Sequence, residues 1–435
     1  MRNLTEHNSS FDELTSTYKR GDFYNLVSNF LFQKPLQGLI MVDIDNLKYI
    51  NRLKSEEIGD MVITKVARNI YRQLPKKAIV GRTSGDEFTI FLHELSSEKE
   101  LSQIAEQLVL SQRVPIHHEG EDLLLTLSAG GLLITDRLCD KSHHDIINYA
   151  EIAMCKAKEY GKNQFVMFED HFVEMLNREQ NILSCIQKQI AKRDFDVVFQ
   201  PMFNIKTGEL VSFEILCRLK SERYGNIPPE EFIRIAENSN IVNSVDEIVL
   251  SKACATLEYI QKNGCHSVGI SVNVSPAHIA RPSFCDAIID IIRSYDIDAS
   301  MLALELTERT LAESMTNTKD IVNKLNAYGI KLYLDDFGIG YSNLSAIADL
   351  PLNRLKMDKG LVDRIKADQD NVLIKKTIEI AKLFHLDVVA EGIETQSQLD
   401  ELKKLDCEIG QGYFLSMPMS FEEVLPFIQN TRMKG

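Results

Sequence analysis

The stretch IKLYLDD, residues 330–336, is a short run of apolar, strand-forming residues that ends in two adjacent carboxylates. The second half of the chain repeats this arrangement, in which a strand-like run ends with or just after an acid or an amide: ELVSFE (209–214), VGISVNV (268–274), MLALE (301–305) and LDVVAE (386–391). Helical patterns separate these runs, which is typical of successive βαβ units. About 250 residues is the usual size of a parallel (β/α)8 barrel, so the sequence predicts a TIM-like (β/α)8 barrel here.

The polar residues at the ends of these runs are expected to meet. In such a barrel the carboxyl ends of the strands open on one face, so their side chains would line a single bowl. The residues concerned are Glu214, Asn273, Glu305, Asp335, Asp336, Lys356 and Glu391. Two carboxylates about 4 Å apart repel by roughly 4 kcal/mol at an effective dielectric constant near 20. So many acids in one place therefore imply bound protons or cations, and divalent metal ions are the simplest answer.

The chemistry of this residue set favours a phosphodiester substrate. Carboxylates and one amide suit Mg²⁺ or Mn²⁺ better than Zn²⁺, because hard cations prefer oxygen ligands. Two such ions would neutralise a phosphodiester, activate a water molecule and stabilise the departing oxygen. Lys356 would add a fixed positive charge. Taken singly, each residue could equally be a solvated residue at the rim of the barrel, but their joint occurrence at strand ends favours a metal-dependent site.

The first half of the chain predicts a separate α+β unit. The expected elements are a buried strand at 37–43, an amphipathic helix at 56–74, a hairpin with a two-residue Gly85-Asp86 turn, a helix at 98–112, a strand at 122–134 and a helix at 144–160. Residues 169–192 contain neither Gly nor Pro and predict a connecting helix. The expected domains are therefore residues 1–170 and 171–435.

A second set of charged residues gathers in this first unit. Asp43 ends the buried strand and Asp86 lies at the tip of the hairpin, beside Gly85, where a backbone without a side chain can approach a ligand closely. Two such acids suit Mg²⁺ that bridges phosphates. Lys158 and Lys162, at the end of the third helix, could reach those phosphates. The same residues could also be a strand cap, a turn and a solvated helix end.

The composition is typical of a globular protein and argues against several other classes of protein. The chain has 435 residues, of which 44% are hydrophobic and 26% charged, as in ordinary globular proteins. Its net charge of −14 argues against a nucleic-acid duplex as partner. No apolar run approaches the roughly 20 residues of a membrane helix, the first residues lack a signal-peptide pattern, and the eight cysteines form no CxxC pair. We expect a cytoplasmic protein without a membrane span.

The motifs of the first half resemble, in order, the GGDEF domain of diguanylate cyclases over about residues 11–168: FDELTSTYKRGDF, VDIDNLKYIN, RTSGDEF, TLSAG and AKEYGKN. The resemblance implies that this unit binds Mg²⁺ and GTP. The implied roles are metal binding for Asp43, the Ile44 carbonyl and Asp86, with Glu87 beside them; guanine recognition for Asn51 and Asp60; and phosphate contact for Lys48, Lys158 and Lys162.

The first half also departs from the GGDEF pattern. Ser84 replaces the first glycine of the signature, Ser16 stands where the family has a glycine, and Arg52 stands where an acid is usual. The segment PKKA (75–78) occupies the place of the product-binding motif. Serine adds bulk and restricts the backbone where the nucleotide should approach. These departures favour a unit that binds GTP and regulates, with an active cyclase as the alternative.

The motifs of the second half resemble the EAL domain of phosphodiesterases that hydrolyse cyclic di-GMP, over about residues 175–430: FQPMFNIKTGELVSFEILCRL, SVNVSP, LELTE, LYLDDFGIGYSNL, LKMDKGLV, VVAEGIET and GQGYFLSMP. The implied metal ligands are Glu214, Asn273, Glu305, Asp335 and Asp336, with Glu391 on metal or water, and the implied catalytic residues are Lys356, Glu391, Glu214 and Asp335. Gln200, Leu216 and Arg218 would hold the ligand, Gln411 would orient metal-bound water, and Glu308 would anchor the loop 336–344. Ile215 replaces the alanine of the signature, which should affect packing alone.

The two resemblances together imply a signalling enzyme. The barrel would hydrolyse cyclic di-GMP to pGpG with two Mg²⁺ or Mn²⁺ ions, and the first unit would bind GTP and regulate the barrel through residues 169–192. A homodimer is expected by resemblance. The alternatives are a bifunctional enzyme that also makes cyclic di-GMP and a non-catalytic cyclic di-GMP receptor.

Overall fold

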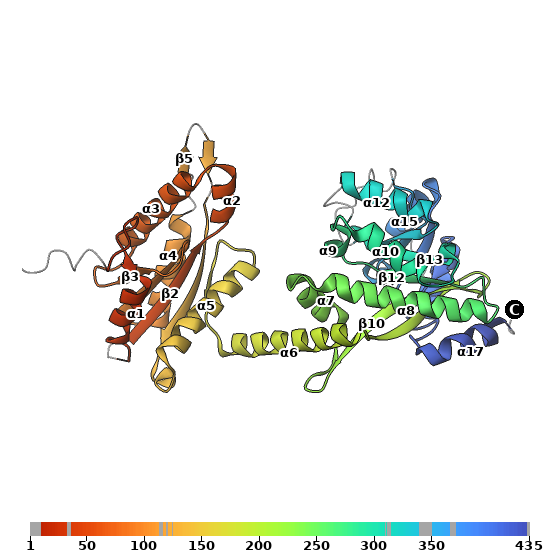
Figure 1. The fold of residues 1–435 in the computed structure, drawn as a ribbon, viewed down its shortest axis with the longest axis horizontal. Coiled ribbons are helices and arrows are strands. Elements are labelled where there is room, and N and C mark those ends of the chain that lie inside the picture. The colour runs from red at the N-terminus through yellow and green to blue at the C-terminus, as the bar shows by residue number, and fades with distance from the viewer. Residues whose placement is uncertain are drawn as a thin grey trace, which may run out of the picture. The chain divides into compact units, whose positions relative to one another are not determined.

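The structure is a computed structural model that describes residues 10–32, 36–112, 116–118, 121–123, 125–308, 310, 315–338, 350–365 and 371–432. The chain divides into two compact units, Met1–Arg178 and Glu179–Gly435 (Figure 1). The division falls within a long helix, α6 (Asp170–Lys192), which is the helix expected at residues 169–192.

The first unit is built on a six-stranded sheet in the order β1-β3-β4-β2-β7-β8. The strands are β1 (Tyr18–Lys19), β2 (Leu36–Ile44), β3 (Ile79–Arg82), β4 (Glu87–Leu95), β7 (Leu127–Ile134) and β8 (Phe165–Met167), with a separate ribbon of β5 (Ile116–His118) and β6 (Glu121–Leu123). The helices are α1 (Arg20–Ser28), α2 (Leu47–Leu53), α3 (Glu56–Gln73), α4 (Glu98–Ser111) and α5 (His143–Glu159).

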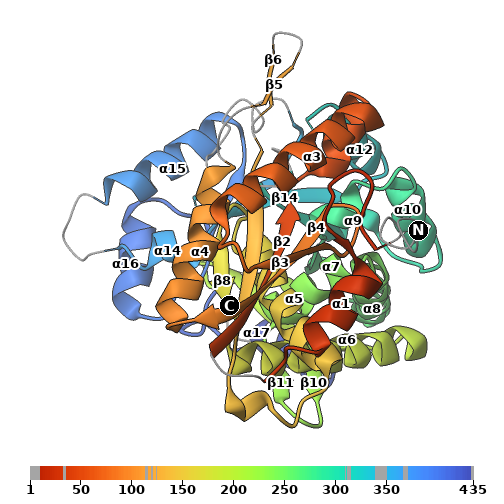
Figure 2. The same cartoon turned by 90° about the vertical axis from the view of Figure 1, so that its left-hand side faces the viewer.

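The alternation of side chains along β2 explains why helices cover both faces of this sheet. Ile40 and Val42 belong to a buried cluster with residues of α3 and α4, whereas Leu39 and Met41 belong to a cluster with residues of α1 and α5. Successive side chains of a strand point to opposite faces, so a strand that is apolar throughout needs cover on both. In Figure 2, α3 and α4 lie over the strands of the sheet.

Two predictions for the first unit were wrong: the length of one turn and the continuity of one strand. The hairpin of β3 and β4 is present, but four residues, 83–86, connect the strands where we expected a two-residue turn. The single strand expected at 122–134 is divided into β6 and β7, which belong to different sheets.

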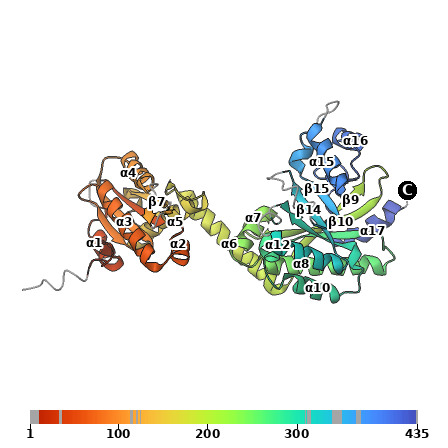
Figure 3. The ribbon, with the colours of Figure 1, turned by 90° about the horizontal axis from the view of Figure 1, so that it is seen from above.

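The second unit contains the expected barrel. The strands follow the order β11-β10-β12-β13-β14-β15-β16-β17-β9, and a further pairing of β9 with β10 closes the ring. Their bounds are β9 (Asp196–Asn204), β10 (Leu210–Ser221), β11 (Gly225–Ile227), β12 (Gly269–Asn273), β13 (Leu302–Thr307), β14 (Lys331–Phe337), β15 (Arg354–Met357), β16 (Asp387–Ala390) and β17 (Ile409–Gly410). Figure 3 shows the strands enclosed by helices such as α8 (Val242–Lys262) and α15 (Val372–Leu383).

The other described helices of this unit complete the outer layer. They are α7 (Pro229–Asn238), α9 (Pro276–Ile279), α10 (Phe284–Arg293), α12 (Met315–Ala327), α14 (Lys359–Val362), α16 (Gln396–Lys404) and α17 (Phe421–Arg432). Within the described part of the chain, no helix combines the length and the apolar character that crossing a membrane requires.

The barrel is not parallel throughout, which corrects our expectation. Strand β9 runs antiparallel to both of its neighbours, β10 and β17. Only residues 205–209 separate β9 from β10. A connection this short joins antiparallel strands, because a parallel pair needs a crossover of a dozen or more residues. The remaining strands of the ring are parallel, so their carboxyl ends still open on one face.

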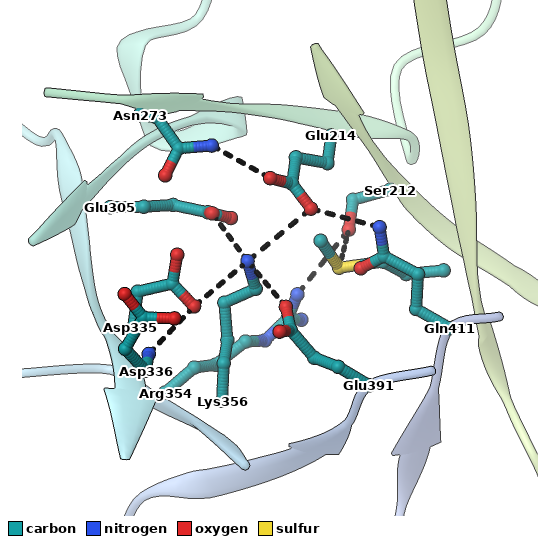
Figure 4. A network of polar contacts seen from close by, with 11 residues as sticks. Ser212, Glu214, Asn273, Glu305, Asp335, Asp336, Arg354, Lys356, Glu391 and Gln411 are labelled. Atoms are coloured by element: carbon teal, nitrogen blue, oxygen red, sulfur yellow. Dashed lines mark hydrogen bonds and ion pairs between the residues drawn. The ribbon is translucent and has the colours of Figure 1, made fainter. Parts of the chain in front are cut away.

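Alternation along the barrel strands separates an apolar outer layer from a polar interior. The outward residues pack against the helices in one large core: Phe213, Ile215, Leu304, Leu332, Leu355 and Met357 are among them. Residues at the positions between them belong to one network of polar contacts (Figure 4): Ser212, Glu214, Glu305, Asp335, Arg354 and Lys356. The period of two in the sequence therefore places the strand-end acids inside the ring.

Candidate functional site

The side chain of Lys356 lies at the centre of the acids that the sequence predicted to meet (Figure 4). It projects from β15, is 1% exposed, and its Nζ lies 2.5 Å from Glu305, 2.6 Å from Glu391, 3.2 Å from Asp335 and 3.3 Å from Glu214. The four carboxylates come from β13, the end of β16, β14 and β10. Barrel closure therefore brings together residues that are up to 177 positions apart in the chain, Glu214 and Glu391.

Glu214 is held at both of its oxygens. Asn273 Nδ2 donates to Oε1 at 2.7 Å, and Gln411 Nε2 donates to Oε2 at 2.8 Å. Burial by itself would raise the pKa of Glu214, but the Lys356 charge and the two amide hydrogen bonds lower it below its ordinary value. Glu214 is therefore a fixed, ionised carboxylate in this arrangement.

A β-bulge brings Asp335 and Asp336 to the same site. Adjacent side chains of a regular strand point to opposite faces. The register of β14 against β15 shifts between Leu334 and Phe337, and Asp336 has a φ of 58°, which costs of the order of 1–3 kcal/mol outside glycine. Burial and the neighbouring Asp335 charge raise the pKa of Asp336 to about 6. Strain of this kind is common where a side chain is aimed at a ligand.

The pKa values show that one ammonium does not neutralise the cluster. Burial would lower the pKa of Lys356, but the surrounding carboxylates hold it well above its ordinary value, so its charge persists. Burial, and then the nearby Glu214 charge, raise the pKa of Glu305 well above its ordinary range. Burial also raises the pKa of Glu391 to about 8, in spite of the Lys356 charge. The cluster therefore has the capacity for further positive charge.

The donor set fits hard divalent cations. The candidate ligands are carboxylate and amide oxygens, which Mg²⁺ and Mn²⁺ prefer. Glu305 Oε1 and Gln411 Oε1 are buried and have no hydrogen-bond partner among the described residues. In this arrangement, no three carboxylate, imidazole or thiol groups of the described chain surround a point that suits a metal ion.

A cavity of about 270 Å³ opens onto the cluster. It is lined by Gln200, Glu214, Asp335, Lys356, Lys359, Glu391, Gly392, Glu394, Gln411, Gly412 and Tyr413. Our reasoning from the sequence missed Lys359, Glu394 and Tyr413. Lys359 and Glu394 form an ion pair at 2.5 Å. The available signal was their position inside the motifs LKMDKGLV, VVAEGIET and GQGYFLSMP.

A second, more apolar groove of about 360 Å³ adjoins the cluster. It contains Leu216 and Arg218, which were predicted to hold the ligand, and it shares Asn273 and Asp336 with the acidic site. The predicted ligand residues are thus divided, with Gln200 in the first cavity and the other two in this groove.

Glu308 follows β13, outside the lining of either cavity. Both of its carboxylate oxygens are buried without a hydrogen-bond partner among the described residues. The loop that it was expected to anchor, 336–344, lies outside the described residues beyond Gly338. Its role stays a prediction.

The first unit has a cavity of its own, of about 560 Å³. It is lined by Asp43, Ile44, Asp45, Asn46, Leu47, Lys48, Tyr49, Arg52, Ser84, Asp86, Glu87, Lys158 and Lys162. Lys158 Nζ lies 2.7 Å from Asp43 Oδ2. Burial raises the pKa of Asp43 although Lys158 opposes it, and burial followed by the Asp43 charge raises that of Glu87.

Two residues expected to read guanine lie outside the lining of this cavity. Asn51 is on α2 and its Oδ1 is buried against Gly59, without a hydrogen-bond partner in the described chain. Asp60 is an exposed residue of α3. In contrast, Asp45, Asn46 and Tyr49, which we did not single out, line the cavity. All three lie inside the motif VDIDNLKYIN (42–51), so membership of that motif was the signal.

Comparison with known families matches both halves of the chain. Residues 184–418 match the family described as "EAL domain", and residues 9–164 match the family described as "Diguanylate cyclase, GGDEF domain". The first match alone covers more than half of the 435 residues.

Curated relatives match most of the length of the chain. The chain is 28% identical over 427 residues to the cyclic di-GMP phosphodiesterase NbdA of Pseudomonas aeruginosa, which covers 97% of the chain and 54% of NbdA. It is 27% identical over 389 residues to the bifunctional diguanylate cyclase/cyclic di-GMP phosphodiesterase MucR of the same organism, covering 89% of the chain and 56% of MucR. The chain thus spans about half the length of the curated relatives it matches.

Solved structures agree with the fold. A phosphodiesterase structure described as PaMucR in complex with c-di-GMP is 29% identical, with a TM-score of 0.54, and covers 56% of this chain and 99% of its own. The S helix-GGDEF-EAL structure of Vibrio cholerae LapD is 18% identical, with a TM-score of 0.52 over 94% of this chain and 97% of its own, which supports the fold alone.

Proposed function

The chain belongs to the EAL-domain family and carries a GGDEF domain ahead of its EAL domain, and from this premise we propose that its barrel hydrolyses cyclic di-GMP to linear pGpG. The observation that carries this proposal is the convergence of four carboxylates from four barrel strands on the buried Lys356. The relatives named as cyclic di-GMP phosphodiesterases support the choice of substrate.

We propose that the acidic cluster holds two Mg²⁺ or Mn²⁺ ions. The residues that would hold them are Glu214, Asn273, Glu305, Asp335 and Asp336, with Glu391 on metal or water. When bound, divalent cations supply charge neutralisation for the phosphodiester and lower the pKa of water. The unpartnered Glu305 Oε1 and the oxygen-only donor set support this choice.

The residues of the chain itself have separable tasks in this proposal. Lys356 supplies a permanent positive charge at the reacting phosphate. Gln200, Leu216 and Arg218 bind the dinucleotide, and Gln411 keeps Glu214 oriented, as their hydrogen bond suggests. In the reaction a water oxygen adds to phosphorus, the bond between phosphorus and the 3′-oxygen breaks, and a proton from the water ends on that oxygen. The linear product leaves with a 3′-hydroxyl and a 5′-phosphate.

The direct test is chromatography of the products from cyclic di-GMP with Mg²⁺ and with Mn²⁺. The full chain should yield pGpG, and Glu214→Ala should abolish it. Glu209→Ala is a matched control, because Glu209 is an exposed acid just before the same strand. No pGpG from the full chain with either ion would reject the proposal, and tight binding without turnover would favour a non-catalytic receptor.

For the first unit we propose that Mg-GTP occupies the cavity around Asp43, the Ile44 carbonyl and Asp86 and regulates the barrel. The cavity combines acids that suit a metal ion with Lys48, Lys158 and Lys162, which suit phosphates. Glu87 lies beside the acids. GTP should alter the rate of cyclic di-GMP hydrolysis in the wild type and not in Asp43→Asn; an unchanged rate in the wild type would remove the regulatory role.

A second candidate function is synthesis of cyclic di-GMP by the same unit, which the bifunctional relative favours. Incubation of the Glu214→Ala protein with GTP and Mg²⁺ decides between these functions, since the barrel cannot then consume the product. Accumulation of cyclic di-GMP would establish the bifunctional enzyme. We also expect a homodimer, which light scattering in solution will test.

A further inference from the structure

A buried polar cluster, formed by Asp246, Ser275 and His278, lies beside the strand end that carries Asn273. Asp246 belongs to α8, Ser275 is the residue immediately before α9, and His278 belongs to α9. The three residues are 7%, 8% and 2% exposed. Ser275 N donates to Asp246 Oδ2 at 3.0 Å, and the Ser275 hydroxyl donates to the same oxygen. This Asp246 cluster belongs to none of the roles described above.

The imidazole of His278 completes the cluster. Its Nδ1 lies 3.2 Å from Asp246 Oδ2. The two groups are within hydrogen-bond distance, and a carboxylate oxygen can accept from an imidazole N–H. The ring packs edge-on against Phe284, with centroids 4.9 Å apart, and Nε2 lies 3.8 Å from Glu247 Oε1. Packing against Phe284 and the contact with Asp246 thus hold the imidazole, which in turn holds the carboxylate.

The Asp246 cluster restrains the segment that follows β12. Ser275 comes two residues after Asn273. On the β13 side, Val274 N donates to the Glu305 carbonyl at 3.1 Å, and Asn273 pairs with Glu305 in the ladder. On the α8 side, Asp246 holds the backbone and the hydroxyl of Ser275. The segment is therefore fixed from two sides, directly after a candidate metal ligand.

The restrained segment is connected to the acidic site through Asn273. Asn273 Nδ2 donates to Glu214 Oε1 at 2.7 Å, and a shift of the segment would lengthen that bond. Asp246 and Ser275 also line the apolar groove, but one Asp246 oxygen already accepts from two Ser275 groups and His278. The contacts favour orientation of the loop over contact with a substrate.

We propose that Asp246, supported by His278, is a positioning residue that orients Asn273, and through it Glu214, for divalent-cation binding. This inference rests on the proposed function of the barrel. Groups that orient metal ligands typically change metal affinity by about 10–100-fold when they are removed. Asp246 contacts Ser275 and His278 rather than a candidate metal ligand, so in this proposal it acts on Asn273 through the backbone of the segment.

The test is calorimetric titration of the full chain with Mn²⁺ in the absence of substrate, together with the KM and kcat for cyclic di-GMP. Asp246→Asn should weaken Mn²⁺ binding by about 10–100-fold and leave KM unchanged at saturating Mn²⁺. Asp286→Asn is the matched control, because Asp286 is an exposed residue of α10 paired with Lys324; it should bind Mn²⁺ as the wild type does. His278→Asn, which keeps an amide donor near Asp246, should retain more affinity than His278→Leu.

The outcomes separate the inference from the proposed function. Wild-type affinity in a folded Asp246→Asn protein overturns the inference, and so does a raised KM with unchanged Mn²⁺ affinity, which would indicate substrate contact. If Asp246→Asn does not fold, Ser275→Ala takes its place, with a smaller loss of affinity expected, and no loss overturns the inference. A wild type that binds no divalent cation removes the proposed function as well.

Discussion

Replacement of Lys356 with methionine should separate the charge of this side chain from its size. Methionine keeps a long unbranched chain but carries no charge. In the structure Nζ lies within 3.3 Å of an oxygen of each of four buried or half-buried carboxylates. The substitution therefore leaves these carboxylates without their shared cation, in a position that is 1% exposed.

The expected loss of unfolding free energy follows from the burial of the Lys356 ion pairs. Removal of one partner of a buried ion pair costs about 3–5 kcal/mol, because the remaining charge is uncompensated. Proton uptake offsets part of this loss, since burial already raises the pKa values of Glu305 and Glu391. We expect the metal-free Lys356→Met protein to lose about 3 kcal/mol of unfolding free energy.

The expected decrease in kcat follows from the electrostatic role proposed for Lys356. Loss of one preorganised contact to developing charge typically costs about 10²–10³-fold in turnover. We therefore expect Lys356→Met to reduce kcat at least about 100-fold in Mn²⁺ while cyclic di-GMP still binds. Binding persists because Gln200, Leu216 and Arg218 are unchanged.

Two measurements check this prediction. Urea unfolding of the metal-free proteins gives the stability difference, and initial rates of pGpG formation give kcat. Lys324→Met is the control, because Lys324 forms one exposed ion pair, with Asp286, and such pairs contribute about 0–1 kcal/mol. Normal turnover by Lys356→Met would refute the electrostatic role, and unchanged unfolding would refute the reasoning from burial.

Three further predictions concern strain, pH and metal. Ser16 has a φ of 57° where a glycine would be relaxed, so Ser16→Gly should raise the free energy of unfolding by up to about 1 kcal/mol in urea titration; destabilisation would contradict this. Hydrogen bonds from Lys206 and Lys382 lower the pKa of Asp406 to about 2. Its contribution is therefore present above the unfolded pKa near 4 and is lost as the pH falls towards 2, so Asp406→Asn should lower the Tm at pH 7 and progressively less at acid pH. Removal of divalent cations with EDTA should abolish hydrolysis while circular dichroism stays unchanged, and activity that survives chelation would contradict the metal requirement.

Much of the fold was predictable because strands and helices leave periodic patterns in the sequence. The barrel was predicted from alternating strand-like and helical patterns and from the length of the second half, and helix α6 from a stretch without Gly or Pro. The reversed direction of β9 was missed, since strand-like residues read the same in either direction. The signal was the short connection to β10, which excludes a parallel pair.

The sequence predicted which residues form the candidate site but not how their side chains are arranged. The strand-end positions of Glu214, Glu305 and Asp335 made their convergence predictable. The central place of Lys356 was not, because the reach of a side chain across the ring depends on the stagger of the strands. Asn51 is a different case, because it lies inside a recognisable motif but outside the lining of the cavity that the motif forms, and its role in guanine recognition stays a prediction.

The sequence by itself determined which side chains face the interior of the barrel, because alternation along a strand is a local property of the chain. Only the tertiary structure decided that a bulge turns Asp336 into the site, that Lys356 lies among four acids, and that Asp246 restrains the loop after Asn273. These contacts join segments far apart in the chain. Their distances follow from ring closure and helix packing, which no local pattern encodes.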